Sequence, residues 1–430
     1  MASACPTSTY PFSASCFTLL ENNTSHLKIP IIQTTELRPS ELLLRRAHHV
    51  LAWIMHFYIH SLPPSAEIRI PAPITVPLLE VCEQLQLPPV ITYADDVLYN
   101  WALKVPSAEP IPALDNLRSL SLFTGTRDEE EFYLTSARIE LRGVDALEVM
   151  RVTMDELFIG DALATRRITR YLHSLSRVID DLARLILSVR DGCDPDVFYH
   201  CIRPWFNGAD SGTRRWHFEG LDTHPHLVLP DELSGPSAAQ SPLIHSLDVF
   251  LGIDHTPSPS SSPKMEPTRP ADDEEGVHVP PKAPFLVRMR AYMPRHHRNF
   301  LRHLAATPRP LREAVARTGD APLTDAYNAS LAALRRLRDA HLRLVALYIV
   351  GPSHRAPAAA AAKESEEETA GAAAAGGRGC SAAMAGFGRG CAASAASAKG
   401  MLLGTGGTDM IRFLKGVRDR TSDAALELDG

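Results

Sequence analysis

The feature that most constrains the fold is a long amphipathic segment, residues 322–350, with a histidine in its apolar face. An unpaired buried polar group costs roughly 1–3 kcal/mol, so a buried imidazole needs a hydrogen-bond partner or a metal. His341 is therefore either a hydrogen-bonded core residue or an axial ligand of an iron in an apolar pocket. The other residues of this face recur at intervals of three and four, as in a helix with one buried side: they are Leu323, Tyr327, Leu331, Leu334, Leu337, Leu344 and Tyr348.

Arg335 and Arg338 precede this histidine by six and three residues, near one edge of the apolar face. Guanidinium groups at these positions could meet an anion beside the same pocket. The segment therefore predicts a site that combines an imidazole, an apolar surface and a cation.

The composition is that of a globular protein rather than a membrane or nucleic-acid-binding chain. The 430 residues exceed what one core usually supports, and 45% are hydrophobic while 22% are charged. A net charge of −6 gives no reason to expect a nucleic-acid or anionic-membrane partner. The seven cysteines form no Cys-x-x-Cys pair, which argues against a disulfide framework or a zinc site. We expect reduced thiols, no secretory signal or membrane span, and a cytoplasmic location.

Hydrophobic periodicity predicts helices along most of the chain. Strand signals are few and confined to the first hundred residues, so we expect a mainly α protein with a small mixed N-terminal part. Within the first helix, His56 and His60 have a spacing that can chelate a metal, but we expect them to be partly exposed instead. The predicted helices cover Glu41–Ser61, Pro77–Leu85, Phe132–Met150, Val149–Val189, Ser241–Gly252, Pro284–Leu304, Pro322–Val350 and Met410–Val417.

Two stretches are too biased in composition to form a packed core. Residues 256–284 are rich in proline and serine with an acidic run, and residues 354–400 are rich in alanine, glycine and serine. We expect both to be disordered insertions. The second leads into a glycine-rich loop, Gly404 to Thr408, which is either a simple turn or a mobile lid over an occupied pocket.

Nine separated blocks, in a fixed order, resemble the indoleamine 2,3-dioxygenases, which are haem enzymes that open the indole ring of tryptophan. The resemblance covers most of the chain outside the N-terminal tail and the two insertions. The blocks are Tyr93 to Leu98 with Trp101, Phe132 to Ser136, Ile202 to Phe206, Phe218 to Gly220, Ser237 to Ser241, Leu247 to Ile253, Met289 to Leu301, Arg338 to His341, and Gly404 to Thr408 with Phe413 to Lys415.

This resemblance implies an organisation in which a large all-helical haem-binding domain carries the chemistry. The N-terminal segment, residues 1–35, would be irregular, residues 36–122 would form a small domain, and residues 123–430 would form the catalytic domain. The cofactor would be haem b, with its iron ferrous in the active form.

The resemblance also implies the roles of individual residues. His341 would be the axial ligand, Arg338 would pair with a haem propionate, and Asp248 would support that arginine. Arg203 would receive the substrate carboxylate, for which a guanidinium fork suits better than a lysine. The remaining implied contacts with substrate or haem are Tyr93, Val97, Phe132, Ser136, Phe198, Ser237, Ala238 and Thr405.

The implied reaction inserts both atoms of O2 across the indole C2–C3 bond of L-tryptophan and yields N-formylkynurenine. This reaction begins the kynurenine pathway, which serves tryptophan catabolism or NAD biosynthesis. The absence of a distal histidine fits a dioxygenase better than a peroxidase, and Ser136 would tune rather than drive the reaction. A separate electron donor would reduce ferric haem, and the protein would be monomeric.

Three positions depart from the family pattern. Pro236 stands where a glycine is common, Asp96 where some members have a small thiol, and Arg138 lies only two residues after Ser136, although helical spacing turns it away from the pocket. Two other readings stay open at this point. One is a haem- or tryptophan-binding sensor of the same fold with little turnover, and the other is a haem-free helical interaction protein in which His341 is a core residue.

Overall fold

The computed structural model describes residues 29–63, 65–211, 214–255, 283–307, 310–355 and 410–427. This part of the chain is mainly helical, with four strands of three residues each among the described residues. The predicted mainly α fold class is therefore confirmed. The glycine-rich loop with Thr405, both predicted insertions apart from residues 283–284 and 354–355, and residues 1–28 lie outside the described residues.

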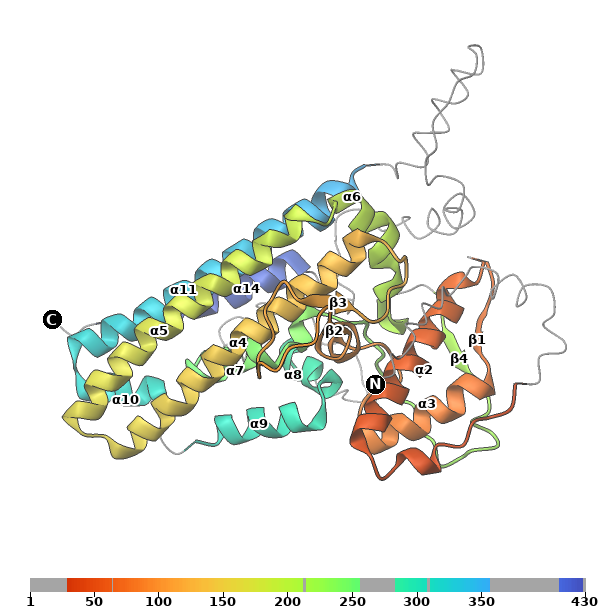
Figure 1. Cartoon of the computed structure of the whole chain (residues 1–430), viewed down its shortest axis with the longest axis horizontal. Coiled ribbons are helices and arrows are strands. Elements are labelled where there is room, and N and C mark those ends of the chain that lie inside the picture. The colour runs from red at the N-terminus through yellow and green to blue at the C-terminus, as the bar shows by residue number, and fades with distance from the viewer. Residues whose placement is uncertain are drawn as a thin grey trace, which may run out of the picture.

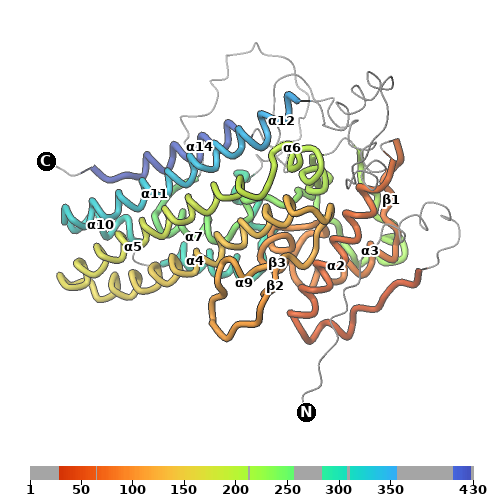
Figure 2. Tube along the Cα trace, turned by 45° about the horizontal axis from the view of Figure 1, so that its top comes forward, coloured from red at the N-terminus to blue at the C-terminus, as the bar shows by residue number. Residues whose placement is uncertain are grey.

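Four long helices form successive layers, in the order α14, α11, α5 and α4 (Figure 2). Helix α5 packs against both α4 and α11, whereas α4 and α11 do not pack extensively against each other. The bounds are α4 Arg127–Ile159, α5 Ala162–Leu187, α11 Ala321–Val345 and α14 Met410–Asp423.

Side-chain caps define where these long helices begin. The Thr126 hydroxyl accepts a hydrogen bond from the Glu129 amide at the start of α4, and the Asp320 carboxylate does the same for Leu323 at the start of α11. Between α4 and α5, Gly160 adopts φ 70°, a left-handed conformation that suits glycine, and Asp161 then caps α5.

The larger apolar core lies between these layers. Leu175 of α5 and Leu334 of α11 are both fully buried in it. Tyr327 is also fully buried and donates a 2.6 Å hydrogen bond to the Leu251 carbonyl, which fixes the end of α7 against α11. Burial of this kind contributes about 1.5–3 kcal/mol for each large side chain, so the core determines how α11 is held.

A second apolar core joins the N-terminal elements to the rest of the chain. The rings of Trp53, Phe123 and Trp205 stack in a row, with centroids 4.0 Å and 5.0 Å apart. Figure 1 shows α2 and α3 beside the pairing strands β1 and β4. The two helices are α2 Glu41–Ser61 and α3 Ala72–Leu85. Strands β1 Ile68–Ile70 and β4 Trp216–Phe218 pair in parallel, whereas β2 Trp101–Leu103 and β3 Leu117–Ser119 form a separate antiparallel pair.

Short helical turns connect the larger elements and carry much of the predicted site. The α-helical ones are α6 Pro195–Val197, α7 Pro242–Phe250, α8 Phe285–Met289, α9 Arg295–Ala305, α10 Leu311–Thr318 and α12 Gly351–Ser353. The 3-10 and π turns are η1 Thr35–Leu37, η2 Ala94–Leu98, η3 Ser188–Asp191, η4 Phe198–Ile202, η5 Arg203–Phe206, η6 Ala209–Ser211, η7 Ala238–Gln240, η9 Arg290–Tyr292 and η10 Ala346–Val350.

Several predicted elements are confirmed and others are corrected. Helix α2 has the predicted bounds, and all seven apolar residues of the stripe around His341 are buried. A continuous helix over Val149–Val189 was wrong, because Gly160 and Asp161 end one helix and cap the next. The predicted helix Pro284–Leu304 is likewise divided, because Pro294 separates η9 from α9.

The prediction that strands are confined to the first hundred residues was also wrong. Strand β4 follows β1 by more than a hundred residues in the sequence, and yet the two strands pair. No local sequence pattern can indicate such a pairing. The expected exposure of His56 was wrong too. Its Nδ1 lies 3.0 Å from the Trp205 carbonyl and its Nε2 accepts from the Ile91 amide at 3.3 Å, so both ring nitrogens are already occupied.

Among the described residues, no helix combines the length and apolar character needed to cross a bilayer. The proposed domain boundaries at residues 35 and 122 stay predictions. The second core draws residues from both sides of the boundary at 122, so any division there is bridged by apolar contacts.

Replacing Leu175 with alanine should lower the free energy of unfolding by about 3 kcal/mol, because it removes a fully buried side chain between α5 and its neighbours. Leu163→Ala is the matched control, since this leucine lies on the same helix and is 50% exposed. Urea unfolding followed by circular dichroism would measure both. Equal losses for the two variants would contradict this description of the core.

Candidate functional site

The His341 side chain is the first component of the site. It projects from α11 between the buried residues Leu337 and Leu344, is itself partly buried, and makes no hydrogen bond to any residue that the structure describes. Burial alone lowers the pKa of this imidazole to about 4, so the ring is neutral near pH 7 and keeps a free lone pair. The interpretation of His341 as a hydrogen-bonded core residue is therefore not supported, because its ring has no hydrogen-bond partner in the described part of the chain.

Arg338 lies one turn earlier on α11, and its guanidinium is held from two sides. It donates to the Asp248 carboxylate of α7, and it donates to the Thr421 hydroxyl of α14. His255 lies 2.7 Å from the other oxygen of Asp248. Burial opposes ionisation of Asp248, but the nearby Arg338 charge and the His255 hydrogen bond keep its pKa below the usual value. A buried ion pair thus fixes a cation beside His341.

The implied pairing of Arg338 with Asp248 is present in the structure. Arg335 differs from expectation, because its side chain is 53% exposed and lies 3.9 Å from Asp339. It turns to the outer face of α11, so the expectation that it meets an anion in the pocket was wrong. Arg335 and Arg338 are three residues apart, so their side chains leave the helix in neighbouring but different directions. The apolar face of the helix ends between these two residues.

Aromatic rings form a wall that links α4 to the continuation of α11. The rings of Phe132 and Phe198 lie 4.5 Å apart, and Phe206 stacks on Phe132 at 5.8 Å. Tyr348 of η10 meets the Phe198 ring edge-on at 5.7 Å and is anchored by a 2.6 Å hydrogen bond to the Cys193 carbonyl. Two rings implied for indole binding are therefore in direct contact with each other.

Arg203 begins the 3-10 turn η5, five residues after Phe198. Its guanidinium is half-buried and lies 5.5 Å from the centroid of the Tyr199 ring. Burial lowers the pKa of Arg203, and the proximity of Tyr199 works in the opposite direction. A guanidinium stays charged at neutral pH, so this arginine presents a partly desolvated cation close to the aromatic wall.

The loop with Ser237 and Ala238 is held close to Tyr93. Gln240 spans the two, because its side-chain oxygen accepts from the Tyr93 amide at 2.9 Å and its side-chain nitrogen donates to the Gly235 carbonyl at 3.0 Å. A Cβ at Gly235 would lie 1.8 Å from the Phe206 carbonyl oxygen, so only glycine permits this approach. The loop is therefore fixed against the turn that follows Arg203.

Glu140 is the polar residue of the site that sequence reasoning missed. Both Tyr93 and Ser241 donate hydrogen bonds to the same oxygen of its carboxyl group, at 2.9 Å and 2.5 Å. Burial raises the pKa of Glu140 to about 7, although these two hydrogen bonds work in the other direction. Its spacing of four from Ser136 on α4 was the available signal, because residues four apart share a helix face.

The structure brings most of the implied residues into one region. Tyr93 and Val97 pack against Ala137 of α4, while Phe132 and the half-buried Ser136 lie on the same helix. Arg138 points elsewhere, since it bonds to Glu131 and to the Leu114 carbonyl, as helical spacing predicted. Thr405 lies outside the described residues. The roles assigned to all these side chains stay predictions.

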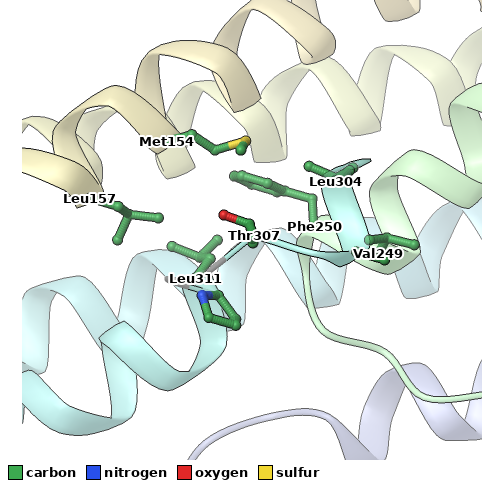
Figure 3. Close-up of a pocket in the computed structure, with 9 residues that line it drawn as sticks. Met154, Leu157, Val249, Phe250, Leu304, Thr307 and Leu311 are labelled. Carbon is green, nitrogen blue, oxygen red and sulfur yellow. The ribbon is translucent and has the colours of Figure 1, made fainter. Parts of the chain in front are cut away.

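A separate pocket of about 210 Å³ lies where α4, α7, α9 and α10 meet (Figure 3). None of the implied site residues lines it. The lining is almost entirely apolar, and it consists of Met154, Leu157, Val249, Phe250, Leu304, Ala305, Thr307, Pro310 and Leu311. This pocket is a gap at a helix junction rather than a site with converging polar groups.

The donor set around His341 fits a haem group. A neutral imidazole without a partner can ligate iron, and a fixed arginine beside it can pair with a propionate. Across the described residues, no three histidine, cysteine, aspartate or glutamate side chains gather to hold a metal ion directly.

Comparison with known proteins gives a consistent result. A family model described as indoleamine 2,3-dioxygenase matches residues 21–424. The chain is 31% identical to indoleamine 2,3-dioxygenase 1 of Rattus norvegicus over 93% of its own length and 84% of that protein. It is 30% identical to indoleamine 2,3-dioxygenase of Saccharomyces cerevisiae over 88% and 77%, respectively. It is also 28% identical, over 91% and 83%, to a 6-hydroxytryptophan 2,3-dioxygenase of Fusarium equiseti.

The raised pKa of Glu140 has a measurable consequence for stability. A glutamate with a folded-state pKa of about 7 and an unfolded value near 4.5 favours folding below pH 4.5, and this advantage is lost as the pH rises through 7. Glu140→Gln removes the titration. Its free energy of unfolding relative to the unmodified protein should therefore increase by about 3 kcal/mol between pH 4.5 and pH 8.

Urea unfolding at several pH values would test this, with Glu313→Gln as the control because Glu313 is exposed on α10. The stability difference for the control should stay constant with pH. A constant difference for Glu140→Gln as well would mean that Glu140 titrates normally and that the hydrogen-bonded arrangement with Tyr93 and Ser241 is wrong.

Proposed function

Because the chain belongs to the indoleamine 2,3-dioxygenase family, we propose that it converts L-tryptophan and O2 to N-formylkynurenine. Members of this family are haem-dependent dioxygenases, so the chain is an oxidoreductase of that class. The single observation that carries the proposal is the partnerless, neutral imidazole of His341 beside the buried pair of Arg338 and Asp248. His341 is only partly buried, so a ring nitrogen is accessible to a cofactor beside α11, and the buried ion pair supplies a fixed cation one turn away.

The haem would be held from α11. His341 would ligate the iron, Arg338 would pair with a propionate, and Asp248 would keep that arginine oriented. The bound haem supplies the redox chemistry by which O2 is activated. Every other contribution of the protein is to bind the substrate, orient it and exclude water.

The substrate would be held at two ends. Arg203 would bind the carboxylate of the amino acid through two parallel hydrogen bonds, which a guanidinium offers and an ammonium does not. Phe132 and Phe198 would fix the indole ring and displace water from it, with Tyr93 and Val97 closing one side. By resemblance, Ser237, Ala238 and Thr405 would complete the enclosure around the amino-acid part.

The overall reaction requires no net proton transfer to or from the protein. Both oxygen atoms enter the substrate and no water is released, so N-formylkynurenine equals tryptophan plus O2 in composition. A strong distal acid or base is therefore unnecessary, and a hydroxyl at Ser136 suffices to tune the polarity of the pocket. Glu140, one turn further along α4, would hold its proton near neutral pH and keep the Tyr93 hydroxyl in place.

A haem- or tryptophan-binding sensor is the second candidate function. A sensor of haem alone would need His341 but no carboxylate grip, so the partly desolvated guanidinium of Arg203 argues against that form of sensor. A cytoplasmic monomer that receives electrons from a separate donor, acting in tryptophan catabolism or NAD biosynthesis, belongs to the same proposal. Among the described residues, Cys82 and Cys193 form no disulfide, which is in keeping with a reducing compartment.

The proposal is tested by incubating haem-loaded protein with L-tryptophan, O2 and a chemical reductant. Formation of N-formylkynurenine at several turnovers per minute or faster supports the enzyme. Binding of tryptophan without product, in protein with a full haem complement, would support the sensor instead. A purified protein that takes up no haem would contradict both.

His341→Ala should abolish haem retention, because it removes the imidazole proposed to ligate the iron. The Soret absorbance relative to protein absorbance should fall at least tenfold after desalting, while far-ultraviolet circular dichroism stays unchanged. His303→Ala is the control, since His303 is exposed on α9 and should retain the full band. A normal Soret band in His341→Ala would show that another residue ligates the iron.

Arg203→Lys should lower kcat/KM for L-tryptophan by about 10- to 100-fold, since charged hydrogen bonds contribute roughly 1.5–3 kcal/mol. The effect should be much smaller for tryptamine, which has no carboxylate. Arg302→Lys, an exposed arginine on α9, is the matched control and should behave like the unmodified enzyme. An equal loss for both substrates would exclude a carboxylate grip at position 203.

A further inference from the structure

Asp96 has a carboxyl group without a partner in the interior of the protein. It lies in the π turn η2, directly before Val97, and is only 4% exposed. Neither of its oxygens makes a hydrogen bond to any described residue, and Oδ1 is completely enclosed. Its neighbour Asp95 contrasts with it, because that carboxylate binds His48 at 2.9 Å and the Thr92 hydroxyl at 2.7 Å.

The surroundings of Asp96 favour the neutral acid. Burial raises its pKa well above the usual value, and the negative charges of Asp95 and Glu129 raise it further. The carboxylate of Glu129 is itself saturated, since it accepts from the amides of Phe123 and Thr124 at 2.6 Å each. A protonated carboxyl group offers one donor and two acceptor sites, so Asp96 can both give and receive a hydrogen bond.

A second unpartnered polar atom lies on the facing helix. The Tyr133 hydroxyl is buried close to the Glu129 carboxyl group, but the two form no hydrogen bond of ordinary geometry. Helix α4, which carries Tyr133, packs against η2, which carries Asp96, so the two residues come from adjoining elements. The Tyr133 ring contacts Phe132 at 6.0 Å and Phe206 at 5.9 Å, so it belongs to the aromatic wall.

Both residues adjoin the place proposed for the indole ring. Val97, next to Asp96, packs on Ala137, which lies one turn after Tyr133 on the same face of α4. If Arg203 holds the amino-acid end and Phe132 and Phe198 flank the ring, the remaining edge is the benzo ring. This edge would then face η2 and Tyr133. The step rests on the proposed function, because it uses the substrate orientation assigned there.

We propose that Asp96 and Tyr133 recognise a hydroxyl or amino substituent on the benzo ring of an indole amino acid, and so make this enzyme prefer ring-substituted tryptophans. A pocket built to hydrogen-bond a substituent discriminates against the analogue that lacks it, because its own polar groups then stay unpaired. The two unsatisfied atoms, on separate elements and beside one ring site, are the polar groups that such a substrate would satisfy.

The test compares tryptophan with its 4-, 5-, 6- and 7-hydroxy derivatives on the haem-loaded enzyme. Asp96→Cys replaces the carboxyl group by a weakly polar group of similar size, and Asp96→Asn keeps hydrogen-bonding ability. For at least one isomer, the ratio of its kcat/KM to that of tryptophan should fall tenfold or more in Asp96→Cys. The ratio should be largely retained in Asp96→Asn and partly reduced in Tyr133→Phe. Asp222→Cys, an exposed position, is the control.

Dissociation constants from calorimetry provide a readout that is independent of turnover, and they should show the same preference and the same loss. Ratios within twofold of the unmodified enzyme for all four isomers, in both Asp96→Cys and Tyr133→Phe, would overturn the inference. That result would mean that buried water satisfies the two groups. Failure of every substrate, including tryptophan, in haem-loaded protein would instead contradict the proposed function, so the two failures are distinguishable.

Discussion

The site depends on one constraint, which is the position of a neutral imidazole without a partner on the apolar face of α11. The stripe around His341 is fixed by burial against α5, and the Tyr327 hydroxyl ties the same helix to the end of α7. One turn from the histidine, Arg338 is held by Asp248 and Thr421, which come from α7 and α14. Three helices thus converge on a single ligand and its neighbouring cation. These contacts orient the residues beside a metal ligand, as the groups around a metal site do.

The distal half of the site is built differently, from short turns rather than long helices. Phe198, Arg203 and Tyr93 all lie in or beside π and 3-10 turns, where the backbone can present side chains that a regular helix would point elsewhere. Gln240 and the close approach of Gly235 to Phe206 fix these turns against one another. The Glu140 carboxyl group accepts a hydrogen bond from the Tyr93 hydroxyl, whereas the Asp96 carboxyl group has no hydrogen-bond partner among the described residues. Residues of these turns would mainly determine substrate specificity, whereas the long helices would hold the cofactor.

Much of this architecture could be predicted from local patterns, and the rest could not for identifiable reasons. Helix α2 was predicted with its observed bounds because its apolar side recurs at helical intervals and the paired prolines after Leu62 stop it. The face of α11 follows from periodicity alone. In contrast, the parallel pairing of β1 with β4 joins segments about 150 residues apart, and Glu140 gains partners 47 and 101 residues away. Periodicity carries no information about such contacts. The break at Gly160 and Asp161 was overlooked although glycine followed by a capping residue was visible.

The most direct test of the account is a crystal structure of the haem-loaded protein with anomalous diffraction at the iron edge. If His341 ligates the iron, one strong iron peak should lie at about 2 Å from a ring nitrogen of this residue, the usual length of a metal–imidazole bond. The macrocycle should lie against the face of α11 that carries His341, with a propionate near Arg338. An iron peak beside any other residue, or a His341 ring hydrogen-bonded to protein with the haem bound elsewhere, would contradict the central claim.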